Sequence, residues 1–235
     1  MNKLGPDVEQ MLSLQLSEEQ EANFLRYAEE ILEWNKRSNL TSIRSLEGVR
    51  SRHFLDSLSC WIAMRAGGDK VIDVGSGAGL PGLALKIIHN PMQLTLLESA
   101  GKKTKFIQHS VQVLGLDGVR VEQARVEDFG QLPGEREKYD WAIARAVAPL
   151  PVLAEYLLPL VRVGGYMLAQ KSRKAKEEAR AAKNAVRMLG GGGIDVREVQ
   201  VPGLDAERYL VVIKKILPTP AKYPRRVGVA SKNSL

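Results

Sequence analysis

The amino-acid sequence predicts an α/β fold with a seven-stranded, mostly parallel sheet whose last strand is antiparallel, preceded by a helical N-terminal extension. Between residues 70 and 188 short apolar runs alternate with helical patterns, which is typical of a parallel sheet covered by helices on both faces. The last two apolar runs, 194–201 and 208–214, are joined by PGLDAE, which is too short for a parallel crossover. These two runs are therefore expected to form an antiparallel hairpin.

Residues 1–67 are interpreted as the helical extension, because no strand pattern occurs in them. Residues 17–35 predict an amphipathic helix, since Ser17 and Gln20 have the spacing of a capping box and apolar side chains recur at helical intervals. A second helix is expected over residues 47–65, ended by Gly67 and Gly68. The predicted apolar stripe of the first helix consists of Phe24, Tyr27, Ala28, Ile31 and Trp34.

The α/β domain is expected to span residues 68–217, followed by a basic tail at 218–235. Its helices are predicted at 80–88, 101–114, 151–161 and 174–188. The four glycines at 190–193 are interpreted as a flexible joint ahead of the hairpin. The first five strands are predicted at 70–74, 93–98, 119–123, 139–144 and 165–170.

The positive charge of the chain is concentrated in its second half. The formal net charge is +7, and residues 162–187 hold eight basic side chains against two acidic ones. From Arg208 to the C-terminus there are seven basic residues and no acidic one. Such clustering favours a polyanionic partner such as nucleic acid, although a solvated helix face and a basic tail would give the same pattern.

Composition also argues against several classes of protein. No run of about 18 apolar residues occurs, and the N-terminus lacks the pattern of a signal peptide. The single cysteine, Cys60, cannot form an internal disulfide. His, Cys and acidic residues do not show the spacing of metal ligands. A cytoplasmic protein with no membrane span and no metal site is therefore expected.

The segment VIDVGSGAGLPG, residues 71–82, places several glycines at a turn from a buried strand to a helix. Ligands of open α/β sheets bind at this carboxyl edge, and glycine lets a ligand approach the backbone closely. The next strand ends in Glu98, whose carboxylate can accept hydrogen bonds from both hydroxyls of a ribose. An adenosine-containing cofactor is therefore predicted, with Glu127 or Asp128 accepting from the exocyclic amine of its adenine.

Two cofactors compete for this loop. Residues 77, 79 and 82 satisfy the G-x-G-x-x-G pattern of dinucleotide sites, and Glu98 follows at the required distance. In the other register Asp73 precedes Gly75, Gly77 and Gly79, which is the pattern of enzymes that use S-adenosylmethionine (SAM). The Asp73 carboxylate would repel a pyrophosphate but would accept a methionine ammonium group. The sequence therefore favours SAM over a nicotinamide dinucleotide.

The fourth predicted strand and the residues that follow it narrow the choice of methyl acceptor. This segment reads YDWAIARAVAPLP and lacks the acidic or Asn-Pro-Pro-aromatic stretch that holds an exocyclic amine for methylation. A pyrimidine carbon would require a cysteine nucleophile, and Cys60 lies before the cofactor loop. A ring nitrogen with a free lone pair, such as guanine N7, remains and needs no general base. Catalysis would then depend on alignment, with Arg145 positioning the base or a phosphate.

Eight collinear segments carry a resemblance to a known family. They are WNKRSNLTSIR, RHFLDSL, VIDVGSGAGLPGLAL, LLESAGKKTKF, RVEDF, ARAVAPL, VPGLDAERYLVVIKK and the C-terminal YPRRVGVASKNSL. They resemble the RsmG family, also called GidB, of bacterial 16S rRNA guanine-N7 methyltransferases, over roughly residues 17–228. The resemblance implies a Rossmann-like class I SAM-dependent methyltransferase that methylates N7 of guanosine 527 in the small-subunit decoding region. In-line displacement without a general base, and a monomer acting on 16S rRNA or on the 30S subunit, are expected.

The loop pattern and the resemblance together define a candidate site. The resemblance implies RNA contacts at His53, Lys102, Lys103, Lys171, Arg225 and Arg226, with Arg145 and Lys171 as candidates for positioning the base. No residue is predicted to be essential for the chemical step itself. An NAD-linked Rossmann oxidoreductase and a non-catalytic RNA-binding protein of the same fold remain as alternatives. The predicted cofactor-binding residues are Asp73, Gly75, Ser76, Gly77, Gly79, Leu80, Glu98, Ser99, Ala100, Val126, Glu127 and Arg145.

Overall fold

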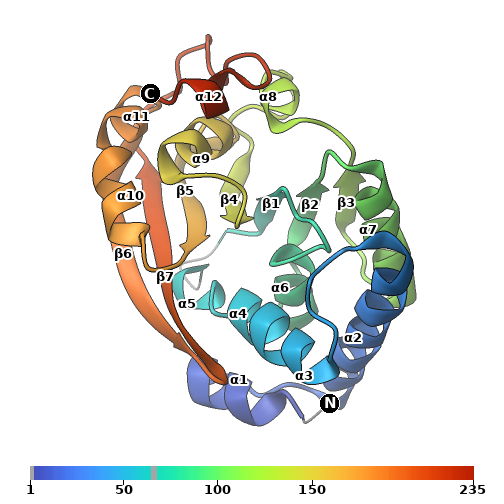
Figure 1. The fold of residues 1–235 in the computed structure, drawn as a ribbon. Helices are drawn as coiled ribbons and strands as arrows, with labels where there is room; N and C mark the ends of the chain where they lie inside the picture. The colour runs from blue at the N-terminus through green and yellow to red at the C-terminus, as the bar shows by residue number, and fades with distance from the viewer. Residues whose placement is uncertain (1–2, 65–67) are drawn as a thin grey trace.

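A seven-stranded sheet with helices on both faces forms the centre of the molecule (Figure 1). The computed structural model describes residues 3–64 and 68–235. The strand order is β3-β2-β1-β4-β5-β7-β6, in which β1 to β5 are parallel and β7 is antiparallel to both of its neighbours. The predicted sheet and its closing hairpin are thereby confirmed. The strands are β1 (Lys70–Val74), β2 (Gln93–Leu97), β3 (Val119–Glu122), β4 (Tyr139–Arg145), β5 (Val161–Lys171), β6 (Gly191–Val201) and β7 (Leu204–Lys215).

Two hydrophobic cores lie on opposite faces of the sheet. The first contains the N-terminal helices together with α6 (Gly82–Ile88) and α7 (Gly101–Val113). The second contains α8 (Val126–Phe129), α9 (Leu150–Leu157), α10 (Ala175–Ala181), α11 (Lys183–Met188) and α12 (Val229–Lys232). Side chains alternate between the faces along a strand, so Val71 enters the first core and Ile72 the second. By the same alternation Asp73 lies on the face that the N-terminal helices cover.

The N-terminal helices share their core with the sheet. Helix α2 (Glu18–Ser38) has the predicted capping box, in which Gln20 N donates to Ser17 Oγ at 3.2 Å and Ser17 N donates to Gln20 Oε1 at 2.9 Å. Its stripe is buried as expected, apart from the half-buried Trp34. Tyr27 stacks on Phe54 with ring centroids 5.3 Å apart. A further helix, α1 (Gly5–Leu12), was not among the predicted elements.

The helix expected over residues 47–65 is divided into α3 (Leu46–Val49), the π-helix η1 (Arg50–Leu55), α4 (Asp56–Leu58) and α5 (Trp61–Met64). Its expected end at Gly67 lies outside the described residues. In the widened turn Asp56 N donates to the carbonyl of Ser51, five positions back. Turns of this kind are often found at functional sites, and η1 carries side chains to the carboxyl edge of the sheet.

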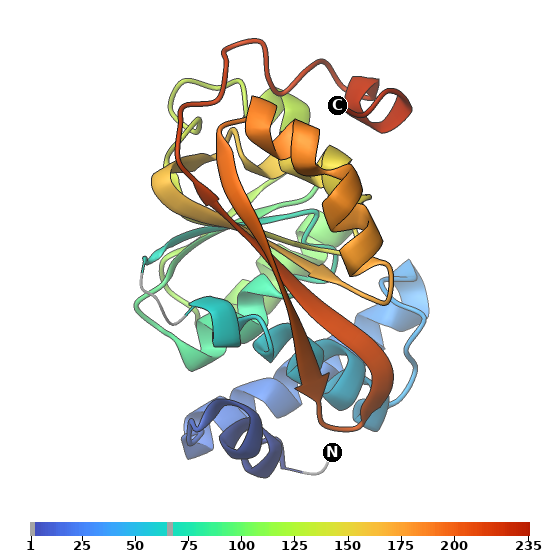
Figure 2. The same cartoon turned by 90° about the vertical axis from the view of Figure 1, so that its left-hand side faces the viewer.

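The prediction of a flexible joint at residues 190–193 was wrong, because Gly191 already belongs to β6. Gly190 has φ +85°, and a Cβ atom there would lie 2.1 Å from the carbonyl oxygen of Leu217. The glycines therefore allow two backbone segments to pack closely. The single helix expected at 174–188 is broken at Ala182 into α10 and α11. Figure 2 shows the long β6–β7 hairpin crossing the molecule towards α1.

Candidate active site

The glycine loop between β1 and α6 is held by hydrogen bonds from the neighbouring strand. Gly75, Gly77 and Gly79 have φ angles of +69°, +61° and +83°, which favour glycine. Gly75 N donates to the carbonyl of Leu97 at 2.8 Å. Glu98, at the end of β2, accepts from Gly77 N at 2.9 Å and from Ala100 N at 2.8 Å, one with each carboxylate oxygen. Glu98 thus fixes both turns, and each oxygen keeps a second lone pair for a ligand hydroxyl.

Asp73 is fully buried beneath this loop. Its Oδ2 accepts from Gly82 N at 2.8 Å, which ties β1 to the start of α6. Burial raises the pKa of Asp73 to about 7, although the Gly82 N–H and the positive charge of Arg145 act in the opposite direction. Its Oδ1 atom has no hydrogen-bond partner within the described residues. A buried acceptor of this kind is stabilised by a ligand that donates to it, above all by a cation.

The residues of the loop fit the amino-acid end and the ribose of SAM. Besides Asp73 Oδ1, the buried hydroxyl of Ser76 lacks a partner among the described residues. A Cβ atom added at Gly77 would have only the carbonyl oxygen of Gly75 near it, at 3.9 Å, so open space lies beside this backbone. The loop thus combines an accessible glycine with two buried polar atoms, Asp73 Oδ1 and Ser76 Oγ, that have no partner within the described residues.

The segment that follows β4 lies against the glycine loop. A Cβ atom at Gly75 would be 2.7 Å from Val147 Cγ2, so the two segments are in contact. Lys171, at the end of β5, donates to the carbonyl of Ala148 at 2.5 Å and forms an ion pair with Glu178 at 2.7 Å. Val147 and Lys171 also line a cavity of about 690 Å³ at this edge of the sheet. The loop and the cavity are therefore adjacent.

Asp56 organises the floor of this cavity. It is 3% exposed and accepts from Arg145 Nη1 at 3.2 Å, from Arg208 Nε at 2.8 Å and from Gln170 Nε2 at 3.0 Å. These three residues come from β4, β7 and β5, and all of them line the cavity. Gln170 Oε1 is buried and has no partner within residues 3–64 and 68–235. Asp56 thus holds two arginines from different strands in place where they line the cavity.

His53 also lines the cavity, and its imidazole is neutral near pH 7. Its Nε2 lies 2.9 Å from Thr41 Oγ1, and its Nδ1 lies 3.2 Å from the carbonyl oxygen of Arg52. Burial lowers the pKa of His53 to about 4, and the nearby charge of Arg145 acts in the same direction. His53 can therefore contact RNA as a neutral hydrogen-bonding group at this pH.

The other predicted RNA contacts have different surroundings. Lys102 and Lys103 lie in the first turn of α7, which begins at Gly101, and Lys102 is exposed. Arg226 is exposed on the C-terminal tail, whereas Arg225 forms an ion pair with the buried Glu155 at 2.6 Å.

The predicted adenine-binding pair Val126–Glu127 begins α8 at the carboxyl end of β3. Both side chains are largely buried. Glu127 Oε1 accepts from Gly228 N at 3.1 Å, so the C-terminal tail reaches the residue expected to bind adenine.

Sequence reasoning did not predict Asp56, Gln170 or Arg208 as site residues. Asp56 lies in RHFLDSL and Arg208 in VPGLDAERYLVVIKK, two segments that had served only to support the resemblance. The available signal was an acidic residue within the mostly apolar stretch 54–64, because such a residue is rarely buried without partners.

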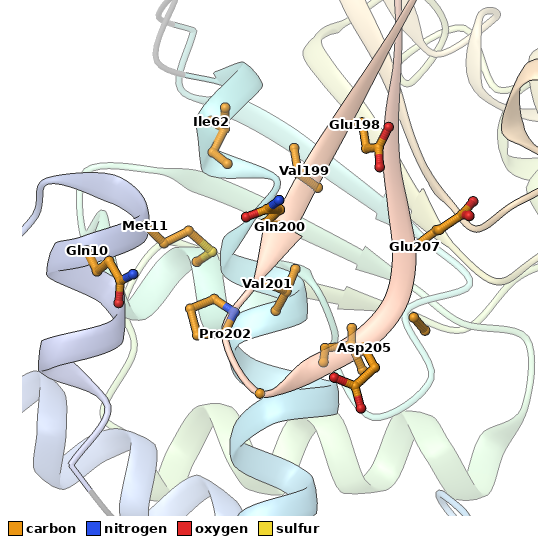
Figure 3. A pocket seen from close by; sticks show the side chains of 13 residues that line it. Gln10, Met11, Ile62, Glu198, Val199, Gln200, Val201, Pro202, Asp205 and Glu207 are labelled. Carbon is orange, nitrogen blue, oxygen red and sulfur yellow. The ribbon is translucent and has the colours of Figure 1, made fainter.

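A second cavity, of about 760 Å³, lies between α1, α5 and the tip of the β6–β7 hairpin (Figure 3). Its lining includes the carboxylates of Glu198, Asp205 and Glu207 and none of the predicted site residues. Its acidic lining would repel a nucleic acid.

Within the described residues, no group of three or more His, Cys, Asp or Glu side chains could hold a metal ion. No helix in the same part of the chain is long and apolar enough to cross a membrane.

Solved methyltransferases share this arrangement of sheet and helices. The crystal structure of a predicted O-methyltransferase from Agrobacterium tumefaciens aligns with a TM-score of 0.53 at 20% identity, over 69% of this chain and 79% of its own. A methyltransferase of Pyrococcus furiosus aligns with a TM-score of 0.53 at 15% identity, over 68% and 83%. TYW2 of M. jannaschii, solved in complex with AdoMet, gives a TM-score of 0.50 at 14% identity, over 63% and 70%. The fold is that of a class I SAM-dependent methyltransferase.

Sequence comparison specifies the family. The profile of the rRNA small subunit methyltransferase G family, GidB, matches residues 20–209. The ribosomal RNA small subunit methyltransferase G of Roseiflexus castenholzii is 48% identical over 222 residues, which cover 94% of each chain. That of Alkaliphilus metalliredigens is 44% identical over 227 residues, covering 96% of this chain and 95% of its own. The chain belongs to the rRNA small subunit methyltransferase G family.

Proposed function

We propose that the protein transfers a methyl group from SAM to N7 of guanosine 527 in 16S rRNA. The observation that carries the proposal is the contact between two features at one edge of the sheet. The glycine loop, beneath which a buried carboxylate oxygen has no partner among the described residues, touches through Val147 the rim of a cavity lined by Arg145, Lys171 and Arg208. The first feature fits a cationic amino-acid ligand, and the second fits an anionic substrate.

The residues of the loop and of the neighbouring strand ends would hold SAM. Asp73 Oδ1 would accept from the ammonium group, and the Glu98 carboxylate would accept from the ribose hydroxyls. Val126 would contact the adenine, while Glu127 accepts from its exocyclic amine. The remaining predicted contacts, Ser76, Leu80, Ser99 and Ala100, belong to the same two loops. When bound, SAM supplies a methyl group on a sulfonium, which a neutral nucleophile can attack directly.

The protein would then act mainly by alignment. Guanine N7 has a free lone pair and carries no proton, so the reaction needs no general base. Fixing the base in line with the methyl group supplies several kcal/mol, up to about 7–11 in well-aligned cases. The hydrogen bonds of Asp56 hold the guanidinium groups of Arg145 and Arg208 in place before the substrate arrives. Arg145 can therefore orient the base or its phosphate with little loss of side-chain freedom.

RNA would approach along the cationic side of this edge. Lys102, Lys103 and Arg226 would contact phosphates, while His53 and Lys171, which line the cavity, would contact the RNA there. Arg225 would contribute through its position on the tail, because Glu155 already engages its guanidinium. Phosphate contacts make binding fall steeply with salt. Since N7 in a stacked helix cannot meet the methyl group in line, the target guanosine would be in a loop or turned out of its stack.

We further infer a cytoplasmic monomer that acts on free 16S rRNA or on the 30S subunit. The two alternatives from the sequence, an NAD-linked oxidoreductase and a non-catalytic RNA-binding protein, make different predictions. The oxidoreductase requires a dinucleotide to bind in the glycine loop. There the buried Asp73 side chain, in its ionised form, would repel the pyrophosphate. The second requires tight RNA binding with no methyl transfer.

The test is to map methylated guanosines. Unmethylated 16S rRNA and 30S subunits are incubated with the protein and methyl-labelled SAM, and N7-methylguanosine is located by chemical strand scission. The expected result is label at guanosine 527 alone, unaffected by excess NAD. Label at another position would refute the proposed target. Absence of label together with tight RNA binding would favour the non-catalytic alternative.

A further inference from the structure

The C-terminal tail, residues 218–235, packs against the second core of the molecule over α8 and α9. In Figure 1 it crosses the top of the sheet as a red segment beside these helices. Tyr223 and Ala230 are buried in the core. Arg136 Nη1 donates to the carbonyl of Tyr223 at 2.5 Å, and Gln131 Nε2 donates to that of Pro224 at 2.6 Å. The tail is therefore part of the folded domain.

Glu155 provides the central anchor of the tail. It lies on α9, is fully buried, and receives Arg225 Nε at 2.8 Å and Arg225 Nη2 at 2.6 Å as well as the backbone N–H of Arg225 at 2.9 Å. Arg225 Nη2 also donates to the carbonyl of Asn233 at 2.8 Å, so the end of the chain folds back onto the Arg225 guanidinium. A charged, forked contact of this kind fixes both position and direction of the backbone.

Three residues further on, the tail reaches the predicted adenine end of the cofactor site. Gly228 N donates to Glu127 Oε1 at 3.1 Å. Burial and, after it, the nearby Glu127 carboxylate raise the pKa of Tyr156, the residue next to Glu155 on α9, to about 12. The Glu127 carboxylate is thus held between α9 and the tail, and Gly228 adopts φ +79° to present its N–H.

We propose that the C-terminal tail is a positioning element for cofactor recognition. The Arg225–Glu155 ion pair holds Gly228 in place, and Gly228 in turn orients the Glu127 carboxylate towards the exocyclic amine of adenine. This inference rests on the proposed function for the identity of the cofactor and adds a role for residues that do not touch it. Arg225 and Glu155 act only through Glu127, so their effect should be confined to ligands that carry the amine.

The test compares two ligands that differ at one edge of the purine, at the exocyclic group and in the protonation of the adjacent N1. S-adenosylhomocysteine carries the exocyclic amine, and S-inosylhomocysteine has a carbonyl in its place. Their affinities are measured by calorimetry for the wild type, Arg225→Ala, Arg225→Lys and a chain ending at residue 226. Lys232→Ala is the matched control, since it removes an exposed charge from the same tail. The shortened chain keeps the ion pair but lacks Gly228, and thermal melts confirm that each variant is folded.

For Arg225→Ala and the shortened chain we expect affinity for S-adenosylhomocysteine to fall about fivefold, as for the loss of one typical hydrogen bond. Affinity for S-inosylhomocysteine should stay the same, Arg225→Lys should recover part of the loss, and Lys232→Ala should match the wild type. Equal weakening of both ligands, or no change in either, would overturn the inference. A wild-type protein that binds neither ligand would instead refute the proposed cofactor, and the inference with it.

Discussion

Replacing Gly77 with alanine tests whether the glycine loop is the cofactor site. In the folded protein the new Cβ atom would meet no protein atom closer than 3.9 Å, so it causes no steric clash within the chain. It would instead project into the space where the ligand is expected. Gly115, in the turn between α7 and β3, supplies a matched control because its φ of +59° nearly equals the +61° of Gly77 and nothing lies within 4 Å of its Cβ position.

The two substitutions should cost the same stability. An alanine in the left-handed region costs roughly 1–2 kcal/mol. The loss of flexibility in the unfolded chain returns about 0.4–1 kcal/mol. The net loss of about 1 kcal/mol corresponds to a fall in Tm of roughly 2–4 °C for a chain of this size. Only Gly77→Ala should also lose cofactor affinity, and by more than tenfold, which corresponds to about 1.4 kcal/mol.

Thermal melts and calorimetric titration with S-adenosylhomocysteine measure the two effects separately. The reasoning would be refuted if Gly77→Ala bound this ligand as tightly as Gly115→Ala does. It would also be refuted if Gly77→Ala were much less stable than its control, because the space beside Gly77 would then be needed by the protein itself.

Four further predictions concern three single side chains. The pKa of Asp73 near 7 means that binding of an ammonium ligand at pH 7 releases about half a proton, detectable by calorimetry in two buffers and absent in Asp73→Asn. In the free protein the same raised pKa makes the free energy of unfolding decrease as the pH rises from about 4 to about 7. In this range the native state keeps a proton on Asp73 that the unfolded chain has lost. For His53 the sign is opposite: the lowered pKa makes stability fall as pH drops from about 6.5 to about 4, and denaturant titrations of His53→Gln should lack this contribution. Lys102→Ala should weaken rRNA binding and reduce the slope of log affinity against log salt by about 0.7–0.9, whereas an unchanged slope would remove Lys102 from the RNA face.

The sheet could be predicted because its signals are local. Alternating apolar runs, the short PGLDAE connection and the glycine turn each specify one element without reference to the rest of the chain. The glycines at 190–193 were misinterpreted for the opposite reason. Their role depends on the approach of Leu217, which is distant in sequence, and glycine composition alone looks the same in a flexible joint and in a close contact.

The position of a candidate residue could be predicted where it depends on a strand end, and not where it depends on a distant partner. Asp73 and Glu98 lie beside the glycine loop, as expected from their places at strand ends. Asp56 could not be placed, since its role depends on Arg145 and Arg208, which lie on separate strands and meet only after the sheet has formed. Counting basic residues in the sequence also could not show which of them are free to bind RNA. Arg225 was counted, although the buried Glu155 carboxylate already pairs with it.

The interior position of β7 has a consequence for how the chain folds while it is being synthesised. This strand is the last to leave the ribosome, yet it lies between β5 and β6. The nascent chain can assemble β1 to β5 early, but β5 keeps an open edge, and β6 has no partner, until residue 215 has emerged. Open edges invite pairing with other chains. Translation that stops shortly before β7 would therefore leave an aggregation-prone product, although most of the sheet and the whole glycine loop had already been made.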